Sequence, residues 1–247
     1  MKIQVLQNAE ELGKAAADQV AFVIREALKK EHFANIILAT GASQFEMLLA
    51  LAKERDINWS RVRMFHLDEY LGIHESHPAS FIKYLKERFV SLVSPLESTF
   101  FIQGDVPDIN SEIDRLNNLI QQYPIDVAMI GIGENGHLAF NDPPADFETE
   151  VPYIIVDLDE DCRRQQLGEG WFPNLEAVPK KAVSMSIRQI MKSKIIICSV
   201  PDARKAKAVS AAVTEDISNK IPASILQEHP NVFLYLDTAS AKDLPTG

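Results

Sequence analysis

Two neighbouring acidic residues, Asp68 and Glu69, directly follow the apolar run from Arg63 to Leu67, which reads as a strand. In open α/β sheets, ligands bind beyond the carboxyl ends of the strands. A carboxylate at such a place is suited to taking a proton from a carbon atom of a substrate, so we take Asp68 as a candidate general base. The same pair also fits solvated loop charges or a helix cap.

A Gly-rich segment after another apolar run, Gly131 to Gly136, matches the GxGxxG pattern of dinucleotide-binding proteins, and Asp157 follows at about the expected distance. That pattern must open a helix, however. The Pro143-Pro144 pair would end any helix here after a turn or two. We therefore do not predict a nucleotide site.

What this segment does present is His137, which lies between Asn135 and Asp142 in the sequence. An imidazole flanked by an amide and a carboxylate on a strand-end loop is suited to acid and base catalysis. A single histidine is also often a structural residue, and that alternative stays open from the residues alone.

A run of small residues, Thr40-Gly41-Ala42-Ser43, separates a strand-like segment, Asn35 to Thr40, from a helix-like one, Phe45 to Lys53. Small residues let backbone N–H groups approach an anion closely, and the N-terminus of the following helix adds partial positive charge. This favours anion binding, although the run also fits an ordinary strand-to-helix turn.

Metal and hydrolase chemistry have less support. His74 and His77 have a spacing at which two side chains can bind one metal ion, but no third ligand follows at a suitable distance. Cys162 and Cys198 are the only cysteines and lack the paired spacing of a structural zinc site. No GxSxG motif surrounds Ser43 or any other serine. The sequence therefore predicts neither a metal site nor a serine hydrolase.

Helix-like and strand-like segments alternate along the chain. The strand-like segments are apolar without polar alternation, which is typical of strands covered on both faces, and hence of a mostly parallel sheet wrapped by helices. We predict an α/β protein with a single domain over residues 1–247. The expected helices are Ala9–Lys30 with Asn8 as its N-cap, Phe45–Lys53, Phe81–Val93, Ser111–Gln122 and Ala203–Thr214, and the expected strands are Asn35–Thr40, Arg63–Leu67, Asp126–Ile132, Ala182–Ile187, Ile195–Val200 and Asn231–Tyr235.

The overall charge restricts the class of ligand. The 247 residues include 25 Lys and Arg against 35 Asp and Glu, a formal net charge of −10, which argues against a nucleic-acid binder. No apolar run approaches the roughly 18 residues that a membrane helix needs, and Met1 to Gln7 lacks the apolar core of a signal peptide. Two cysteines are too few for a disulfide framework. We expect a cytoplasmic protein that does not bind membranes.

Three motifs together resemble those of the glucosamine-6-phosphate deaminase and isomerase family, which is related to the 6-phosphogluconolactonases. They are Thr40-Gly41-Ala42-Ser43, Leu67-Asp68-Glu69-Tyr70 and Gly131 to Pro143, and the resemblance continues through Val178-Pro179-Lys180, Ala203-Arg204-Lys205-Ala206 and His229-Pro230-Asn231-Val232. It implies a Rossmann-like fold without a nucleotide, and conversion of an amino-sugar phosphate to fructose 6-phosphate and ammonia. No cofactor is expected, because enolisation requires only a base, an acid and anion binding.

The resemblance also implies roles for individual residues. Asp68 would move a proton between the second and first sugar carbons, and His137 would open the sugar ring. The remaining roles are those of Asn135 and Asp142 as orienting partners of His137, of Thr40, Gly41, Ala42, Ser43 and Lys205 at the phosphate, and of Gly131 and Ala139 along the sugar.

The chain departs from the family pattern in three places. The family often has Asp at the position of Asn135 and usually Glu at the position of Asp142. Its phosphate-binding Arg usually precedes a Phe-Phe pair, and this chain has a different sequence there, from Arg163 to Phe172. Arg164 is the nearest candidate for the role of that Arg.

The segment Gly168-Glu169-Gly170-Trp171-Phe172 stands where the Phe-Phe pair of the family would be. We expect it to form a flap over the site, because the two glycines give Glu169 backbone freedom and the two aromatic residues can anchor it. Since like charges repel, Glu169 would contact the sugar hydroxyls or the amine rather than the phosphate. The alternative is an exposed turn with Trp171 in the core.

The leading function is therefore an enzyme that deaminates and isomerises glucosamine 6-phosphate, its small-molecule partner. The alternatives are a deaminase and isomerase for another amino-sugar phosphate, such as galactosamine 6-phosphate, a sugar-phosphate lactonase, and a non-catalytic sugar-phosphate sensor. The sequence does not distinguish the epimers. A homo-oligomer is compatible with the resemblance, since family members differ in oligomeric state and in allosteric control.

Overall fold

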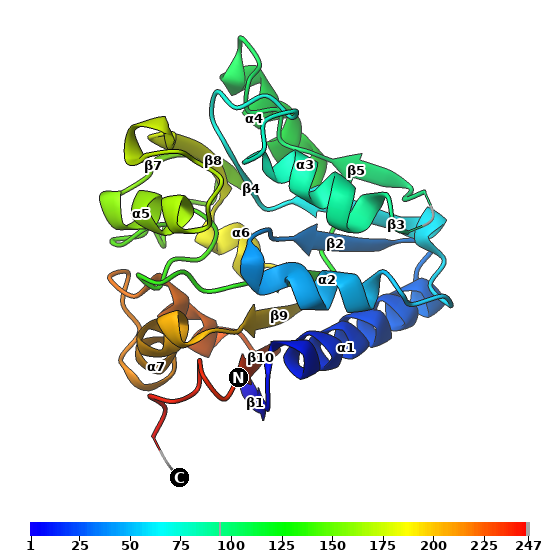
Figure 1. Ribbon diagram of the computed structural model, residues 1–247. Coiled ribbons are helices and arrows are strands. Elements are labelled where there is room, and N and C mark those ends of the chain that lie inside the picture. Colours follow the sequence, from blue (N-terminus) through cyan, green and yellow to red (C-terminus); the bar gives the residue numbers. More distant parts are fainter. Residues whose placement is uncertain (94, 246–247) are drawn as a thin grey trace.

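A seven-stranded parallel sheet forms the centre of the protein in the computed structural model (Figure 1). Its strand order is β1-β10-β9-β6-β2-β3-β5, and each neighbouring pair runs parallel. The predicted α/β class with a mostly parallel sheet is confirmed. The strands are β1 (Lys2–Leu6), β2 (Ala34–Leu38), β3 (Val62–His66), β5 (Ser98–Phe100), β6 (Val127–Ile130), β9 (Ile195–Val200) and β10 (Val232–Asp237).

The structure describes residues 1–93 and 95–245, so Ser94, Thr246 and Gly247 of the expected domain lie outside the described residues. The helices are α1 (Ala9–Lys30), α2 (Phe45–Leu51), α3 (Phe81–Leu85), α4 (Ile109–Ile120), α5 (Glu160–Gly168), α6 (Ile187–Met191) and α7 (Ala206–Thr214). Asn8 is the N-cap of α1, as expected, and its side chain accepts a hydrogen bond from the backbone N–H of Glu11 at 2.9 Å. None of the described helices is long and apolar enough to cross a bilayer.

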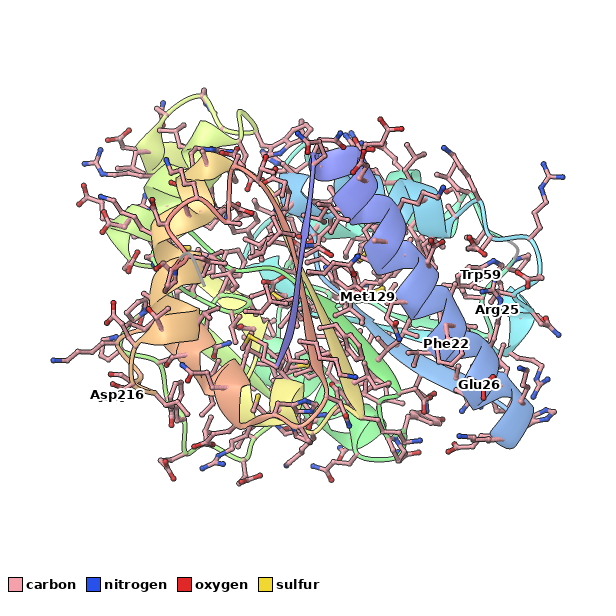
Figure 2. All side chains as sticks on the ribbon, turned by 90° about the horizontal axis from the view of Figure 1, so that it is seen from below. Phe22, Arg25, Glu26, Trp59, Met129 and Asp216 are labelled. Atoms are coloured by element: carbon pink, nitrogen blue, oxygen red, sulfur yellow. The ribbon has the colours of Figure 1, made fainter. Side chains whose placement is uncertain are left out.

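Helices cover both faces of the sheet, which explains why its central strands are continuously apolar. In β2, Ile36 and Leu38 pack in one core with α1, α2 and α3, whereas Ile37 between them packs in a second core with α4, α6 and α7. Figure 2, seen from below, shows α1 on one side of the strands and the orange helix α7 on the other. All three strand residues are fully buried.

A second sheet, three-stranded and antiparallel, lies beside the carboxyl ends of the main strands. It consists of β4 (Asp68–Tyr70), β8 (Lys181–Met185) and β7 (Tyr153–Asp157), with β8 in the centre. The chain passes between the sheets at Leu67, whose N–H donates to Leu38 of β2 at 3.1 Å and whose carbonyl accepts from Met185 of β8 at 2.9 Å. This passage positions Asp68 next to the main sheet.

Some expected elements need correction. The strand expected at Ala182–Ile187 exists as β8, but it belongs to the small antiparallel sheet, and Ile187 already starts α6. The single helix expected at Phe81–Val93 is α3 followed by a π-helical turn, Lys86–Val90. The strands β4 and β5 and the helix α5 were not predicted, because three-residue strands and a helix as polar as α5 leave little periodic signal. The five-residue strand β7 and the short helix α6 were also missed.

Candidate active site

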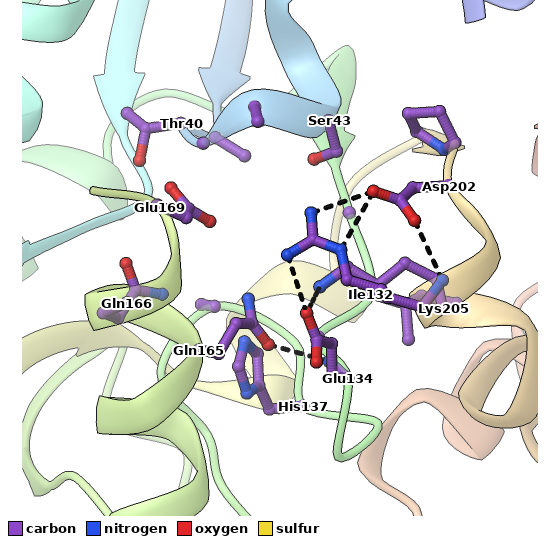
Figure 3. A pocket seen from close by; sticks show the side chains of 18 of the residues that line it. Thr40, Ser43, Ile132, Glu134, His137, Gln165, Gln166, Glu169, Asp202 and Lys205 are labelled. Atoms are coloured by element: carbon purple, nitrogen blue, oxygen red, sulfur yellow. Dashed lines mark hydrogen bonds and ion pairs between the residues drawn. The ribbon is translucent and has the colours of Figure 1, made fainter. Parts of the chain in front are cut away.

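A cavity of about 290 Å³ opens beyond the carboxyl ends of β2, β3, β6 and β9. This is the edge where parallel α/β sheets bind their ligands. Its walls come from the loops that follow these four strands and from the last turn of α5 (Figure 3). The lining includes these candidates from the sequence: Thr40, Gly41, Ala42, Ser43, Asp68, Gly131, His137, Ala139, Glu169 and Lys205.

The small-residue run after β2 forms one end of the cavity. Gly41 has φ +93°, a conformation that side-chain-bearing residues rarely adopt. Figure 3 shows the hydroxyls of Thr40 and Ser43 on the cavity side of this run. Gly131 lies so close that a Cβ atom there would come within 3.1 Å of the Ser43 hydroxyl. Small residues are therefore needed both in the run itself and at Gly131, which faces it.

Asp68 lies on β4, not in a loop, and is only 6% exposed. Burial, with the nearby carboxylates of Glu69 and Glu169, raises the pKa of Asp68 from 3.8 to about 8. No hydrogen bond to its carboxylate occurs among residues 1–93 and 95–245. A carboxylate with this pKa is a stronger base than an exposed aspartate, and it faces the cavity.

Glu69 is fully buried and has a different role from its neighbour. Its carboxylate accepts hydrogen bonds from the N–H groups of Tyr70 and Ile82 and from the hydroxyl of Ser80, at 2.9 to 3.0 Å. Burial raises the pKa of Glu69 to about 7, although these hydrogen bonds lower it. Glu69 thus caps the start of α3, while Asp68 is left facing the cavity.

His137 is held by the two partners that the sequence suggested. The side-chain oxygen of Asn135 accepts from the N–H of His137 at 3.1 Å, and its amide donates to Asp142 at 3.0 Å. Nδ1 of His137 lies 3.1 Å from Oδ1 of Asp142. Burial raises the pKa of Asp142, but the contacts with His137 and Asn135 outweigh burial and hold it below its usual value. The imidazole therefore has a carboxylate behind it and the cavity in front of it.

The backbone of the loop after β6 lies close against the imidazole of His137. A Cβ atom on Gly133 would lie 2.3 Å from the His137 ring, so only glycine fits there. Ala139 lines the cavity with an unusual positive φ of 52°. The N–H of Phe140 donates to Ser184 of β8 at 3.0 Å, which ties the loop to the small sheet. A dinucleotide-binding motif opens a helix, whereas this loop does not.

Two cationic side chains, Lys205 and Arg204, also line the cavity. Lys205 is 7% exposed, and its Nζ lies 3.9 Å from a carboxylate oxygen of Glu134. Burial lowers the pKa of Lys205, with opposition from Glu134 and Glu169. Arg204 also lines the cavity, and its guanidinium lies 2.9 Å from Asp202 and 3.4 Å from Glu134. Sequence reasoning missed Arg204, whose only signal was its place next to Lys205.

Arg164 does not reach the cavity, which is a correction to its expected role at the phosphate. Its side chain is 62% exposed and pairs with Glu160 one turn earlier on α5. Gln165, Gln166 and Glu169 occupy the face of α5 that turns to the cavity. Because α5 was not predicted, no sequence pattern indicated that Arg164 lies on its outer face.

Glu169 does reach the cavity from the end of α5. Its carboxylate lies against the small-residue run, 3.7 Å from where a Cβ atom of Gly41 would be. Burial raises the pKa of Glu169, opposed mainly by Lys205. Phe172 is buried in the core beside the small sheet, whereas Trp171 is 40% exposed. The alternative with Trp171 in the core is therefore wrong, and Phe172 anchors the segment.

The two histidines at metal-ligand spacing lie outside this cavity. Nδ1 of His74 lies 2.9 Å from the hydroxyl of Ser76, and Nδ1 of His77 accepts from the N–H of Ala79 at 3.0 Å. Both rings thus stabilise a turn before α3.

Comparisons with known proteins agree with the geometry. The model of the family described as glucosamine-6-phosphate isomerases/6-phosphogluconolactonase matches residues 7–234. The chain is 36% identical over 246 residues to the glucosamine-6-phosphate deaminase of Streptococcus uberis, covering 99% of this chain and 100% of that one. It is 33% identical over 244 residues to the enzyme of the same name from Lactobacillus delbrueckii subsp. bulgaricus, covering 98% of each.

Solved structures show the same relationship. A monomeric glucosamine-6-phosphate deaminase superposes with a TM-score of 0.89 at 31% identity, covering 98% of this chain and 100% of that one. A 6-phosphogluconolactonase from Thermotoga maritima superposes with a TM-score of 0.78 over 96% of this chain and 99% of that one. At 15% identity, the second similarity shows a shared fold alone.

Proposed function

Because this chain belongs to the family of glucosamine-6-phosphate isomerases and 6-phosphogluconolactonases, we propose that it converts glucosamine 6-phosphate and water to fructose 6-phosphate and ammonia. The observation that carries this proposal is that Asp68 and His137 line the same cavity as Lys205 and Arg204. A base, an acid and an anion site are what enolisation of a sugar phosphate requires.

The proposed reaction begins with ring opening. His137 takes the proton of the anomeric hydroxyl and returns one to the ring oxygen, with Asp142 stabilising the imidazolium between the two transfers. Asp68, as the carboxylate, then takes the proton from the second carbon and delivers it to the first. In the same isomerisation the amine loses one proton and the carbonyl oxygen on the first carbon gains one, which leaves an iminium at the second carbon and a hydroxyl at the first. The iminium adds water and releases ammonia, so that the ketose remains.

The charges on the cavity walls favour a substrate with both an ammonium and a phosphate. Lys205 and Glu169 lie on different sides of the cavity (Figure 3). Arg204 precedes Lys205 in the chain and also lines the cavity, and Asp68 is close enough to Glu169 for the two carboxylates to interact. In this arrangement the phosphate binds to Arg204, to Lys205 and to the Ser43 end of the small-residue run, which lies away from Glu169 (Figure 3). Glu169 then contacts the amine. Arg204 thereby supplies the guanidinium that was expected from Arg164.

We expect Lys205→Ala and Arg204→Ala each to raise KM by at least an order of magnitude. A charge-assisted contact contributes about 1.5 to 3 kcal/mol, which corresponds to roughly 10-fold to 100-fold in affinity. Arg164→Ala is the matched control, since Arg164 is exposed and paired on the outer face of α5. Steady-state kinetics and inhibition by inorganic phosphate provide the measurement. An unchanged KM in the Lys205 variant would mean that its ammonium does not contact the phosphate.

Glu169→Gln tests the contact with the amine. We expect the variant to bind glucosamine 6-phosphate about tenfold more weakly, since it loses a charge-assisted contact. Binding of amine-free glucose 6-phosphate should stay equal or improve, since a negative charge leaves the cavity. Equilibrium binding to wild type and variant gives, for each protein, the ratio of the affinity for glucosamine 6-phosphate to that for glucose 6-phosphate. Equal ratios in the two proteins, together with an unchanged preference between the glucosamine and galactosamine phosphates, would show that Glu169 does not contact the amine.

The cellular location and assembly are also proposals. Cys162 and Cys198 are free thiols, which supports the expected cytoplasmic location, because that compartment is reducing. A sugar phosphate is the expected small-molecule partner, and a homo-oligomer stays a prediction that sedimentation can test.

A further inference from the structure

Three side chains with different metal-binding atoms lie together behind the cavity. One ligand atom each from His137, Asp142 and Cys162 lies within 4.8 Å of the other two. His137 is 7% exposed and Cys162 is 1% exposed. The first two residues come from the loop after β6, and Cys162 comes from the first turn of α5. The fold thus brings together donors that the sequence separates.

The Nδ1 atom of His137 is the unusual member of this cluster. It is buried and lies 3.1 Å from Oδ1 of Asp142, an ion-pair distance, but the two groups are not aligned as in a regular hydrogen bond. The same Asp142 oxygen already accepts from the amide of Asn135. A buried nitrogen with a poorly aligned partner loses part of its hydrogen-bond energy, and a cation between Nδ1 and the carboxylate would satisfy both groups.

The donor atoms indicate which cation would bind. An imidazole nitrogen, a carboxylate oxygen and a thiolate sulfur suit zinc, whereas magnesium and calcium prefer oxygen atoms alone. The carboxylate and the thiolate together neutralise a divalent charge. Burial and the neighbouring Asp142 raise the pKa of the Cys162 thiol, so the thiol proton is released to solvent when the metal binds.

We propose that His137, Asp142 and Cys162 form an inhibitory site for a zinc ion. An imidazole that coordinates zinc through Nδ1 cannot take up a second proton at Nε2, so His137 can no longer alternate between acid and base. Asp142 is held by the metal at the same time. The inhibitory effect rests on the proposed function of His137, whereas zinc binding itself does not.

Cys162→Ser is the variant that tests this site. Serine keeps the size of the side chain and a hydroxyl that can donate to Asp142, but it is a poor zinc ligand. Micromolar zinc should inhibit the wild type, and EDTA should restore the activity. In the variant, half-inhibition relative to its own zinc-free rate should need at least about 100-fold more zinc, since even second-shell changes cost 10-fold to 100-fold in metal affinity. Cys198→Ser is the matched control, because this buried thiol of β9 lies outside the cluster, and it should keep wild-type sensitivity.

Cobalt(II) titration provides a readout that does not depend on turnover. The wild type and the Cys198 variant should show a thiolate-to-cobalt charge-transfer band in the near ultraviolet, and the Cys162 variant should lack it. Equal zinc sensitivity of the Cys162 variant and the wild type, or a cobalt spectrum without the thiolate band, would overturn the proposal. If the band appears but no deamination occurs, the metal site stands and the proposed function fails.

Discussion

Asp68→Asn is expected to lower kcat by about 10² to 10⁴-fold, the usual contribution of a general base. The amide keeps the shape of the side chain and loses its basicity, so binding of the sugar phosphate should persist. Asp157→Asn is a matched control, because that carboxylate of β7 is 81% exposed and pairs with Lys181 at the surface. Kinetics and equilibrium binding check both expectations, and near-normal turnover in the Asp68 variant would remove this residue from the role of base.

The pH dependence gives a second readout for the same residue. Since the base acts as the carboxylate and burial raises the pKa of Asp68 to about 8, kcat/KM of the wild type should rise by about tenfold per pH unit below pH 8 and level off above it. Asp68→Asn should lack this limb. A wild-type profile that is flat from pH 6 to 8 would contradict the proposed environment of Asp68.

The raised pKa of Asp68 also predicts a cost in stability. The unfolded chain ionises Asp68 above about pH 4, whereas the folded protein keeps it protonated up to about pH 8. The folded state is therefore increasingly disfavoured as the pH rises between these two values, and the penalty is constant above them. Asp68→Asn should raise the Tm, and by more at pH 8.5 than at pH 5.

His137→Gln is expected to lower kcat by about 10² to 10⁴-fold relative to the wild type, with little change in KM. Glutamine preserves a polar side chain but cannot exchange protons as imidazole does. His74→Gln is the control, since His74 lies in a turn outside the cavity. Comparing turnover of the variant at several pH values with that of the wild type provides the measurement. A variant with at least a tenth of the wild-type kcat would exclude His137 as the acid and base.

The sequence predicted those parts of the site that lie in long apolar elements or directly after them. The runs that became β2, β3 and β6 were clear, because helices cover both of their faces, and the residues after each strand end do line the cavity. The glycine-rich loop after β6 was interpreted correctly as non-helical, since Pro143 and Pro144 could not continue a helix.

The remaining parts depend on contacts that leave no periodic signal. Asp68 was expected directly after the strand that became β3, and its place on a second strand was missed, because three-residue β4 forms by pairing with β8. Its raised pKa follows from burial that the small sheet creates, which sequence patterns do not show. Arg204 and Arg164 have the same residue type, and only their places in the fold distinguish them. Arg204 lies in a 3₁₀ turn before α7 and lines the cavity, whereas Arg164 lies on the outer face of α5 and is exposed to solvent.

The most direct test of the central claim is to incubate the wild-type protein with glucosamine 6-phosphate and to quantify fructose 6-phosphate and ammonia in the same samples over time. The account predicts that the two products appear in equal amounts, without added metal or cofactor, and that Asp68→Asn slows the formation of both by at least about 100-fold. The account would be contradicted if neither product formed and the protein instead hydrolysed 6-phosphogluconolactone, or if it bound the sugar phosphate without converting it.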